Sequence, residues 1–259
     1  MCKRSVCSIL IVLLLLPLSI IEAKATFEGF WDQTTIVNTP APGLKGEKTI
    51  KQRVFYKNGK MKMLNIETGE YSIYRFDKEL VWQVNPAKKT YQEMTFADME
   101  ASMARSKDAM ADMREKMKDM PPQQRKMMKK MMGSLGNNEP MSIKIVETKE
   151  TKTINAHKCR KVKMIMGEDA VVIMWLTNKY DLGDEFVHLY KRMNMLKGDL
   201  PKNVSKLRGF AIQSISSIGL GNGKKMMSET SVLRIVPKKI PLADFSLPRG
   251  YKKMKFQMN

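Results

Sequence analysis

Residues 79–93 carry the sequence ELVWQVNPAKKTYQE, in which two alternating segments flank the turn-forming stretch Pro86-Ala87-Lys88. Successive side chains of a β-strand point to opposite faces. The large apolar side chains of the first segment accordingly fall at every second position: Leu80, Trp82 and Val84. Two such segments separated by turn-forming residues are typical of antiparallel strands.

The same period of two begins upstream at Phe27 and is divided by further turn signals. The strongest is Lys57-Asn58-Gly59-Lys60, because Asn-Gly between alternating segments favours a type I′ turn, in which both central residues have positive φ. Thr68-Gly69 and Asp77-Lys78 separate the strands that follow. The chain from Phe27 to Met94 therefore predicts an antiparallel meander.

The period then changes to that of a helix. Twelve of the 24 methionines lie in the 48 residues from Met94 to Met141. Thr95 is placed to cap a helix, with Asp98 at the third position of a capping box, and Pro121-Pro122 ends it. Methionines at helical spacing form one stripe: Met99, Met103, Met110, Met113, Met117 and Met120.

The methionine stripe has three explanations. A thioether surface can repack around ligands of differing shape, so the stripe predicts a movable apolar lid over a cavity. The same spacing also fits a helix packed on a filled core. The third explanation is a Cu(I) site, because thioethers are soft ligands and Met110, Met113 and Met117 could converge on one ion. The residues leave all three open, and we expect no cofactor.

A basic, methionine-rich segment follows Pro122. Its cations are Arg125, Lys126, Lys129 and Lys130. One interpretation is a solvated amphipathic helix. The other is an interfacial helix, whose methionines enter the lipid boundary while the cations meet phosphates. Under the second interpretation an anionic membrane surface is a partner.

Strand-like segments resume at Ser142. Between Val171 and Thr177 both faces are apolar, so that one face can meet the core and the other a cavity or a lid. Asp184 to Met195 predicts a second helix. There is no long linker and no internal repeat, so we expect a single domain over residues 26–259 with a helical insertion at about 95–134.

The N-terminus predicts an export signal. Lys3 and Arg4 precede an apolar run from Ser8 to Ile21, and Ala23-Lys24-Ala25 has the small-x-small pattern of a cleavage site. The run is shorter than the ~20 residues that a membrane-spanning helix needs. We expect residues 1–25 to be removed near Ala25, leaving a soluble periplasmic protein.

The composition points to anionic surroundings. The formal net charge is +20, and an exported chain so basic is expected to meet anionic phospholipid headgroups. We expect no nucleic-acid partner, because the chain is exported and its cations are spread along the sequence. Only Cys159 lies outside residues 1–25, so no disulfide within the mature chain is expected.

His157 and Cys159 are two residues apart and would share a face of a strand. A catalytic thiol needs a lowered pKa and an orienting third group, and the sequence offers no recognisable one. A lone cysteine among strand residues is usually a small buried hydrophobe. With no phosphate-binding loop, zinc spacing or nucleophile elbow, the sequence predicts no catalytic residues and a protein that is not an enzyme.

Four pieces of the sequence together resemble an exported bacterial family, domain-of-unknown-function family 4412, which is related to the LolA-like lipoprotein carriers. They are the stretch from Leu80 to Tyr91, the methionine-rich insertion, Ile154-Asn155-Ala156-His157-Lys158-Cys159 with Trp175-Leu176-Thr177 downstream, and Phe245-Ser246-Leu247-Pro248-Arg249-Gly250-Tyr251. The resemblance implies a strongly curved antiparallel sheet, an unclosed half-barrel with helices over its concave face. In relatives that face holds acyl chains or other apolar ligands, and the family has no agreed catalytic residues.

These observations favour a periplasmic, non-enzymatic binding protein for an apolar ligand, a lipid or a lipid-modified chain. The expected cavity residues are Trp82, Val84, Tyr91, Ile173 and Trp175 from the sheet, with Met99, Met103, Met110, Met113 and Met117 from the lid. The sheet assignments depend on strand phase, because a slip of one residue reverses the face of every side chain. The alternatives are a Cu(I)-binding envelope protein and a structural or adaptor protein with a filled core.

Overall fold

A computed structural model describes residues 26–40, 46–125, 143–167, 170–182, 204–220 and 224–255. These residues form one sheet of twelve strands. The first six strands are β1 (Gly29–Thr39), β2 (Gly46–Lys57), β3 (Lys60–Asn65), β4 (Tyr71–Arg75), β5 (Leu80–Asn85) and β6 (Thr90–Thr95). The others are β7 (Ile143–Ile154), β8 (His157–Met166), β9 (Ala170–Thr177), β10 (Phe210–Gly219), β11 (Lys225–Pro237) and β12 (Lys252–Met254). The long helix is α1 (Phe96–Lys118), and the 3₁₀ turns are η1 (Phe76–Lys78), η2 (Val204–Leu207) and η3 (Leu242–Phe245).

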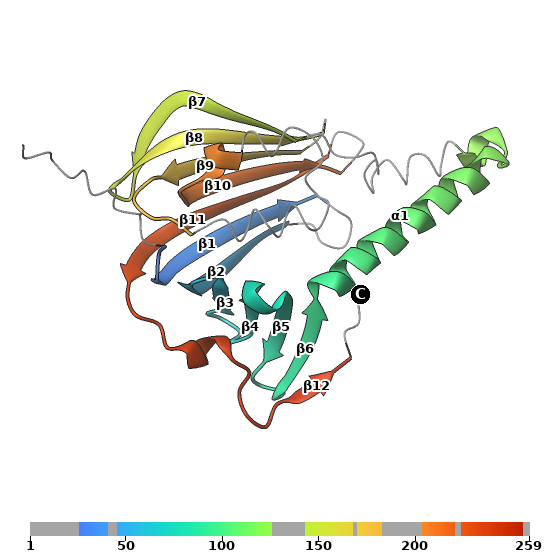
Figure 1. The fold of residues 1–259 in the computed structure, drawn as a ribbon. Coiled ribbons are helices and arrows are strands. Elements are labelled where there is room, and N and C mark those ends of the chain that lie inside the picture. Colours follow the sequence, from blue (N-terminus) through green and yellow to red (C-terminus); the bar gives the residue numbers. More distant parts are fainter. Residues whose placement is uncertain are drawn as a thin grey trace, which may run out of the picture.

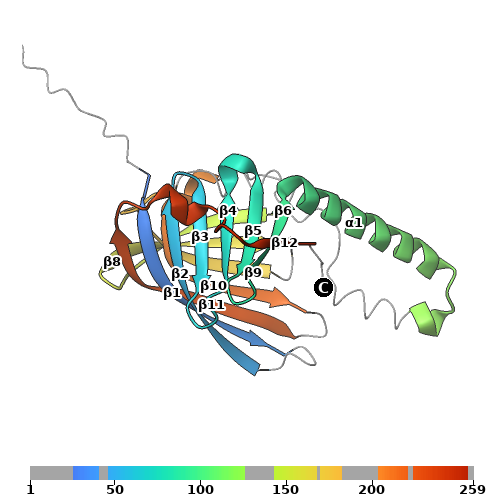
Figure 2. The ribbon, with the colours of Figure 1, turned by 90° about the horizontal axis from the view of Figure 1, so that it is seen from below.

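The sheet is strongly curved and unclosed (Figures 1 and 2). Its neighbouring strands are antiparallel, except that β12 runs parallel to β6 at one edge, and β7 forms the other edge. The predicted mainly β fold with a curved antiparallel sheet is therefore confirmed. The hairpin predicted at Asn58-Gly59 is also confirmed, because the two residues have φ values of 43° and 66°.

The two faces of the sheet have different surroundings. The sheet bends around a concave side, and the chain that follows β11 runs along the opposite, convex side (Figures 1 and 2). We call these the inner and the outer face. On β5, Trp82 and Val84 lie on the outer face, and Val81 and Gln83 therefore lie on the inner face.

The main core lies where the two halves of the sheet meet. Trp31 and Tyr56 come from the first half, and Phe210 and Ile212 come from the second half, and all four are buried in one cluster. The ring centroids of Trp31 and Phe210 are 5.0 Å apart in an edge-to-face arrangement, which is a favourable aromatic geometry. The hydrogen-bonded pairing of β1 with β11 joins the two meanders into one sheet, and this packing stabilises the junction.

A second core lies on the outer face of β4 and β5. It is made by residues 238–255, which we call the C-terminal strap. Ile240 and Phe245 of the strap are 3% and 0% exposed, and they pack against Ile73, Trp82 and Val84. The strap then ends as β12 beside β6, so it covers part of the outer face and also occupies an edge of the sheet.

Asp32 links three strands on the outer face. Its carboxylate accepts hydrogen bonds from Arg53 Nε at 2.7 Å and Arg53 Nη2 at 3.1 Å, and from Arg234 Nε at 2.6 Å. The hydrogen bond from Arg53 is the largest reason why the pKa of Asp32 is lowered from its ordinary value. Only 14% of the Asp32 side chain is exposed, so water screens this contact little.

Asp32→Asn is expected to lower the free energy of unfolding by about 2 kcal/mol at neutral pH, because hydrogen bonds to charged groups are lost. A carboxyl with a lowered pKa in the folded state stabilises the fold above its unfolded pKa of about 3.9, and loses this contribution as the pH falls through the folded pKa. Urea unfolding at pH 7 and pH 3 should therefore show a smaller difference between wild type and variant at pH 3. An equal difference at both pH values would contradict this role of Asp32.

Helix α1 does not lie over the sheet, where the predicted lid would be. Thr95 and Asp98 form the predicted capping box, but β6 ends at Thr95 and α1 begins at Phe96, so no loop allows the helix to turn back. Phe96 packs edge-on against Phe76 with ring centroids 6.1 Å apart, and from there α1 runs outward beyond the sheet (Figures 1 and 2). The described part of the helix thus does not cover the concave face.

Among the described residues, no helix is both long enough and apolar enough to cross a membrane. The predicted export signal, residues 1–25, lies outside the described residues. The predicted second helix at Asp184 to Met195 also lies outside them.

Candidate functional site

A cavity of about 610 Å³ lies at one end of the sheet, over the inner face. Its inner-face lining comes from β2 to β6 and from β12: Gln52, Met63, Asn65, Ser72, Tyr74, Gln83, Asn85, Thr90, Gln92 and Met254. We call this cavity the inner-face pocket. Its volume lies within the range of about 300 to 1,000 Å³ that is usual for small-molecule sites.

Strand register brings the polar residues of the pocket into one row. Ser72 of β4 pairs with Met63 of β3 and with Gln83 of β5, and Gln83 pairs in turn with Gln92 of β6. Directly paired residues of antiparallel strands have side chains on the same face and close together. The pocket wall is therefore a band of amides and a hydroxyl, bordered by a methionine.

A chain of hydrogen bonds orients one of these amides from the core. Trp31 Nε1 donates to Gln33 Oε1 at 2.8 Å, and Gln33 Nε2 donates to Gln52 Oε1 at 3.0 Å. Trp31 is 6% exposed and is fixed by the aromatic core. In this series of hydrogen bonds the side-chain oxygen of Gln52 is the acceptor. The side-chain NH₂ group of Gln52 can therefore donate a hydrogen bond to a ligand in the pocket.

The apolar part of the pocket is made by Met63, Tyr74 and Met254. The Tyr74 ring stacks on Phe76, with centroids 6.3 Å apart and an angle of 19° between the ring planes. Methionine side chains adapt to ligand shape, and an aromatic ring offers a rigid apolar surface. The pocket thus combines an apolar surface with a band of uncharged polar groups.

Charged residues lie at another part of the lining. Glu70 accepts a hydrogen bond from Asn85 Nδ2 at 2.6 Å. Lys88 and Lys255 also line the pocket. An amide both donates and accepts hydrogen bonds, so the band suits hydroxyl or amide groups, and the lysines suit an anion.

The five expected sheet residues share one face, but that face is the outer one. Trp82 and Val84 are 9% and 3% exposed beneath the C-terminal strap, and Trp82 Nε1 donates to Glu93 Oε2 at 2.7 Å. Val84 and Tyr91 are also among the residues that border the inner-face pocket. The expectation that this face meets a methionine lid is wrong, because the strap covers it instead.

Strand register places Ile173 and Trp175 on the outer face of the other half of the sheet, and Trp175 also belongs to the buried cluster that contains Trp31 and Phe210. Trp175 is 8% exposed, and the Nζ atoms of Lys152 and Lys161 lie 4.2 and 5.6 Å from its ring centroid. Neither residue lines the inner-face pocket. The structure therefore separates them from Val84 and Tyr91.

Of the expected lid methionines, Met99, Met113 and Met117 do not line the pocket. Met99 is half-buried, Met113 is 41% exposed and Met117 is buried. The side chains of Met103 and Met110 lie outside the described part of the structure, so the copper site at Met110, Met113 and Met117 stays a prediction.

Arg125 has a local structural role. Its Nε donates to Met117 O at 3.1 Å, and its Nη2 donates to Lys118 O at 2.6 Å and to Met120 O at 3.0 Å. A guanidinium group in this position satisfies carbonyls at the end of α1. The other three expected membrane contacts, Lys126, Lys129 and Lys130, lie outside the described residues.

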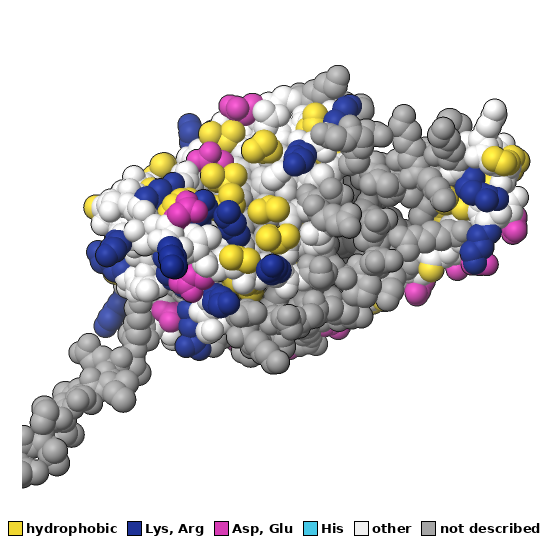
Figure 3. Space-filling model, turned by 90° about the horizontal axis from the view of Figure 1, so that it is seen from above, with side chains coloured by type: hydrophobic (Ala, Val, Ile, Leu, Met, Phe, Trp, Pro, Cys, Tyr) yellow, Lys and Arg dark blue, Asp and Glu magenta, His cyan; other side chains and the backbone are white. Residues whose placement is uncertain are grey.

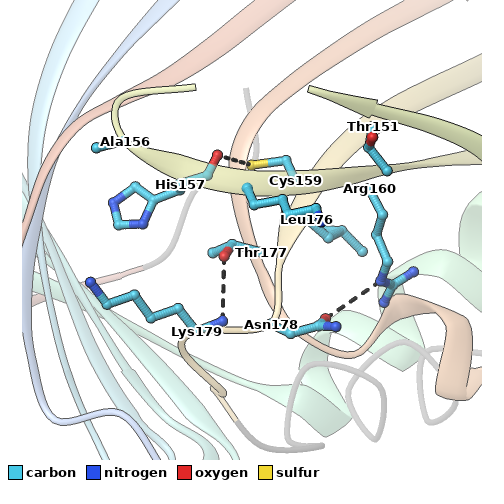
Figure 4. A pocket seen from close by; sticks show the side chains of 10 residues that line it. Thr151, Ala156, His157, Cys159, Arg160, Leu176, Thr177, Asn178 and Lys179 are labelled. Atoms are coloured by element: carbon cyan, nitrogen blue, oxygen red, sulfur yellow. Dashed lines mark hydrogen bonds between the residues drawn. The ribbon is translucent and has the colours of Figure 1, made fainter. Parts of the chain in front are cut away.

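A second cavity, of about 500 Å³, lies at the end of β8 and β9 (Figure 4). Cys159 Sγ donates to His157 O at 3.3 Å, and burial raises the pKa of the Cys159 thiol. Burial also lowers the pKa of His157, whose Nδ1 has no hydrogen-bond partner among the described residues. A protonated thiol and an imidazole without an orienting partner are not an activated nucleophile and base.

Sequence reasoning named Val84 and Tyr91, which border the inner-face pocket, but missed the polar residues of its wall. The signal that could have found them is the repeated placement of glutamine on strands, at Gln33, Gln52, Gln83 and Gln92. Glutamine inside a strand is uncommon on a face that packs against a core. Four such positions on one face indicate a polar cavity wall.

No protein-family model and no curated protein matches the chain, so the resemblance to family 4412 stays a prediction. An uncharacterized conserved protein from Thermus thermophilus is similar in structure, with 6% identity over 87% of this chain and 91% of that chain and a TM-score of 0.42. PNGF-II has 12% identity over 88% of this chain and 32% of that chain, with a TM-score of 0.36. The LolA superfamily protein NE2245 from Nitrosomonas europaea has 9% identity over 86% of this chain and 92% of that chain, with a TM-score of 0.34. No residue role or activity is carried over at this level of similarity.

Proposed function

We propose that the protein is an exported, non-enzymatic binding protein that holds an amphipathic ligand, a lipid or a lipid-modified chain, in the inner-face pocket. The observation that carries this proposal is the lining of the pocket. Met63, Tyr74 and Met254 supply an apolar surface, and the amide band supplies hydrogen bonds to an uncharged polar group. A few polar groups placed on an apolar wall are typical of ligand sites.

The charged residues support a lipid with an anionic headgroup. The pocket is lined by two lysines, Lys88 and Lys255, and by one carboxylate, Glu70, so a phosphate beside the lysines would meet a net positive charge. The acyl part of the ligand would lie on the methionines and Tyr74. The periplasm is the proposed location, because the N-terminal sequence has the pattern of an export signal.

The proposal that the protein is not an enzyme rests on the weak nucleophilicity of Cys159, the one cysteine outside residues 1–25. Burial raises the pKa of Cys159, so the thiol is protonated at neutral pH and is a poor nucleophile. The inner-face pocket is lined by amides, hydroxyls and lysines, together with Glu70, which is hydrogen-bonded to Asn85.

Native mass spectrometry of the protein, purified gently from its own envelope, tests this function. We expect a bound mass in the lipid range. Copper in place of lipid would favour the Cu(I)-binding alternative, and the absence of both would favour a structural role.

Gln83→Leu is expected to weaken lipid binding by roughly fivefold, because a hydrogen bond of about 1 kcal/mol is lost when an amide of the ligand site is replaced by a branched apolar side chain. Thr153→Leu is the matched control, since Thr153 is an exposed strand residue outside the pocket. Bound lipid should be unchanged in the control. Equal occupancy in both variants would show that the lipid lies elsewhere.

A further inference from the structure

The outer face of β7 to β10 carries aliphatic and lysine side chains side by side. Strand register arranges them in two rows. The first row is Val146, Lys163, Ile173 and Ile215, and the second row is Lys144, Ile165, Val171 and Ser217. We call these eight residues the lysine–aliphatic face. All of them are at least partly exposed.

The two halves of the outer face differ in how their apolar side chains are covered. On β4 and β5 the apolar side chains are covered by Ile240 and Phe245 of the C-terminal strap. Seen from above, the surface shows apolar side chains interspersed with lysine and arginine and with some acidic side chains (Figure 3). Glu229, for example, pairs directly with Ile215. Met227, which pairs with Ser217 at the margin of the face, is 50% exposed. The five aliphatic side chains of the face are each half-buried, but strand register makes them neighbours. Contiguous apolar side chains that reach the surface mark interaction sites.

The lysines of the face lie beyond ion-pair distance of every carboxylate that the structure describes. Within the described part of the chain, neither Lys144 nor Lys163 forms an ion pair. The pKa of Glu150 is lowered by its hydrogen bond from Lys161 and also by the nearby charge of Lys163. Lys161, which lies beside the face, pairs with Glu150 at 2.7 Å. The formal net charge of +20 adds a general attraction to anionic surfaces.

The composition of the face distinguishes between two kinds of partner. Protein interfaces are enriched in aromatic residues, methionine and arginine, and are depleted in lysine. The eight residues of the lysine–aliphatic face are three isoleucines, two valines, two lysines and one serine, with no aromatic residue or arginine among them. Aliphatic side chains beside flexible lysines suit a lipid interface, where the stems of the lysines remain apolar and their ammonium groups reach the phosphates.

We propose that the lysine–aliphatic face docks the protein on an anionic phospholipid bilayer. The isoleucines and valines enter the boundary of the acyl region, and Lys144 and Lys163 contact lipid phosphates. This surface is on the opposite side of the sheet from the inner-face pocket, so docking does not depend on the proposed ligand.

Vesicle co-sedimentation tests the proposal with the chain from Thr26 onward, which contains every described element. The probes are phosphatidylcholine vesicles and vesicles that also contain phosphatidylglycerol. We expect binding to the anionic vesicles. Each lysine near such a surface contributes a factor of about five to binding, so the double variant Lys144→Glu with Lys163→Glu should bind roughly 30-fold more weakly.

A matched control separates docking from general charge attraction. Lys238→Glu with Lys239→Glu changes the net charge equally at two exposed lysines of the C-terminal strap. This control should weaken binding less than threefold at the same salt concentration. An equal loss in both double variants would overturn the proposal.

The aliphatic residues have their own test. Ile173→Thr with Ile215→Thr keeps β-branched side chains that suit strands, and it removes apolar surface. We expect binding to anionic vesicles to fall by about tenfold while circular dichroism and the unfolding midpoint show a folded protein. Unchanged binding in this variant, or no binding of the wild type to either kind of vesicle, would overturn the proposal.

Discussion

Phe245→Ala is expected to destabilise the protein by about 3 to 5 kcal/mol, the range for removing a buried phenylalanine from a core. Phe245 is 0% exposed and packs in the cluster that contains Ile73, Trp82 and Val84. Its loss leaves a cavity between the C-terminal strap and the outer face, and it exposes Trp82. Equilibrium urea unfolding, followed by tryptophan fluorescence, measures the change.

Leu242→Ala is the matched control for this prediction. Leu242 lies in the same 3₁₀ turn as Phe245 but is 61% exposed, so we expect a change below about 0.5 kcal/mol. A large loss of stability in the control, or a small one in Phe245→Ala, would show that the strap does not form this core.

Trp31→Ala is expected to cost a similar amount, about 3 to 5 kcal/mol. Trp31 packs against Phe210 and Phe27, with ring centroids 5.0 and 6.1 Å apart, at the junction of the two halves of the sheet. Its indole N–H also holds Gln33, which in turn holds Gln52 in the inner-face pocket. Thermal or urea unfolding should therefore show a strongly weakened core.

Trp31→Phe separates the core role of Trp31 from its role in the pocket. A phenylalanine ring keeps most of the packing but cannot donate to Gln33, so we expect a smaller loss of about 1 to 2 kcal/mol. Lipid occupancy in native mass spectrometry should fall because Gln52 loses its fixed orientation. Wild-type occupancy in a folded Trp31→Phe protein would refute the link between Trp31 and the pocket.

Local patterns predicted the elements of the N-terminal half well. The Asn58-Gly59 turn, the strand at Leu80 to Asn85 and the capping box of Thr95 and Asp98 each depend on neighbouring residues only. Side-chain alternation and capping are visible in a sequence because they act over a few positions. These features therefore appear in the structure as expected.

The length of β7 was harder to predict. The apolar alternation stops near Glu147, but the strand continues to Ile154 after a register shift between Glu147 and Thr151. Most side chains beyond Glu147 are exposed on both faces. A strand without a buried face has no apolar alternation, and the sequence does not mark its end.

The alternation of side chains shows which residues share a face of the sheet, but it does not show which of the two faces is concave. Trp82, Ile173 and Trp175 do share one face, as expected, but the sign of the curvature places that face outside. That face is buried in part by the C-terminal strap, whose Phe245 lies 163 residues after Trp82 in the sequence and packs in the same cluster. An irregular strap with a short parallel strand has no periodic pattern that predicts where it packs.

The polar part of the candidate site was not predicted. Only large apolar residues were assigned to the cavity, and of these Val84 and Tyr91 do border the inner-face pocket, whereas its amides, such as Gln83 and Gln92, were not expected. The methionine-rich helix was predicted to cover the cavity because its composition is unusual. Its direct connection to β6 directs it away from the sheet.

The central claim is that the inner-face pocket, and not the methionine helix, holds the ligand. Methyl groups of ¹³C-labelled methionine, assigned by single Met→Leu variants, report on both places in one NMR titration with lysophosphatidylglycerol. The account predicts that the signals of Met63 and Met254 shift with saturation while that of Met113 stays fixed. Shifts of Met113 with unchanged signals from Met63 and Met254 would contradict it.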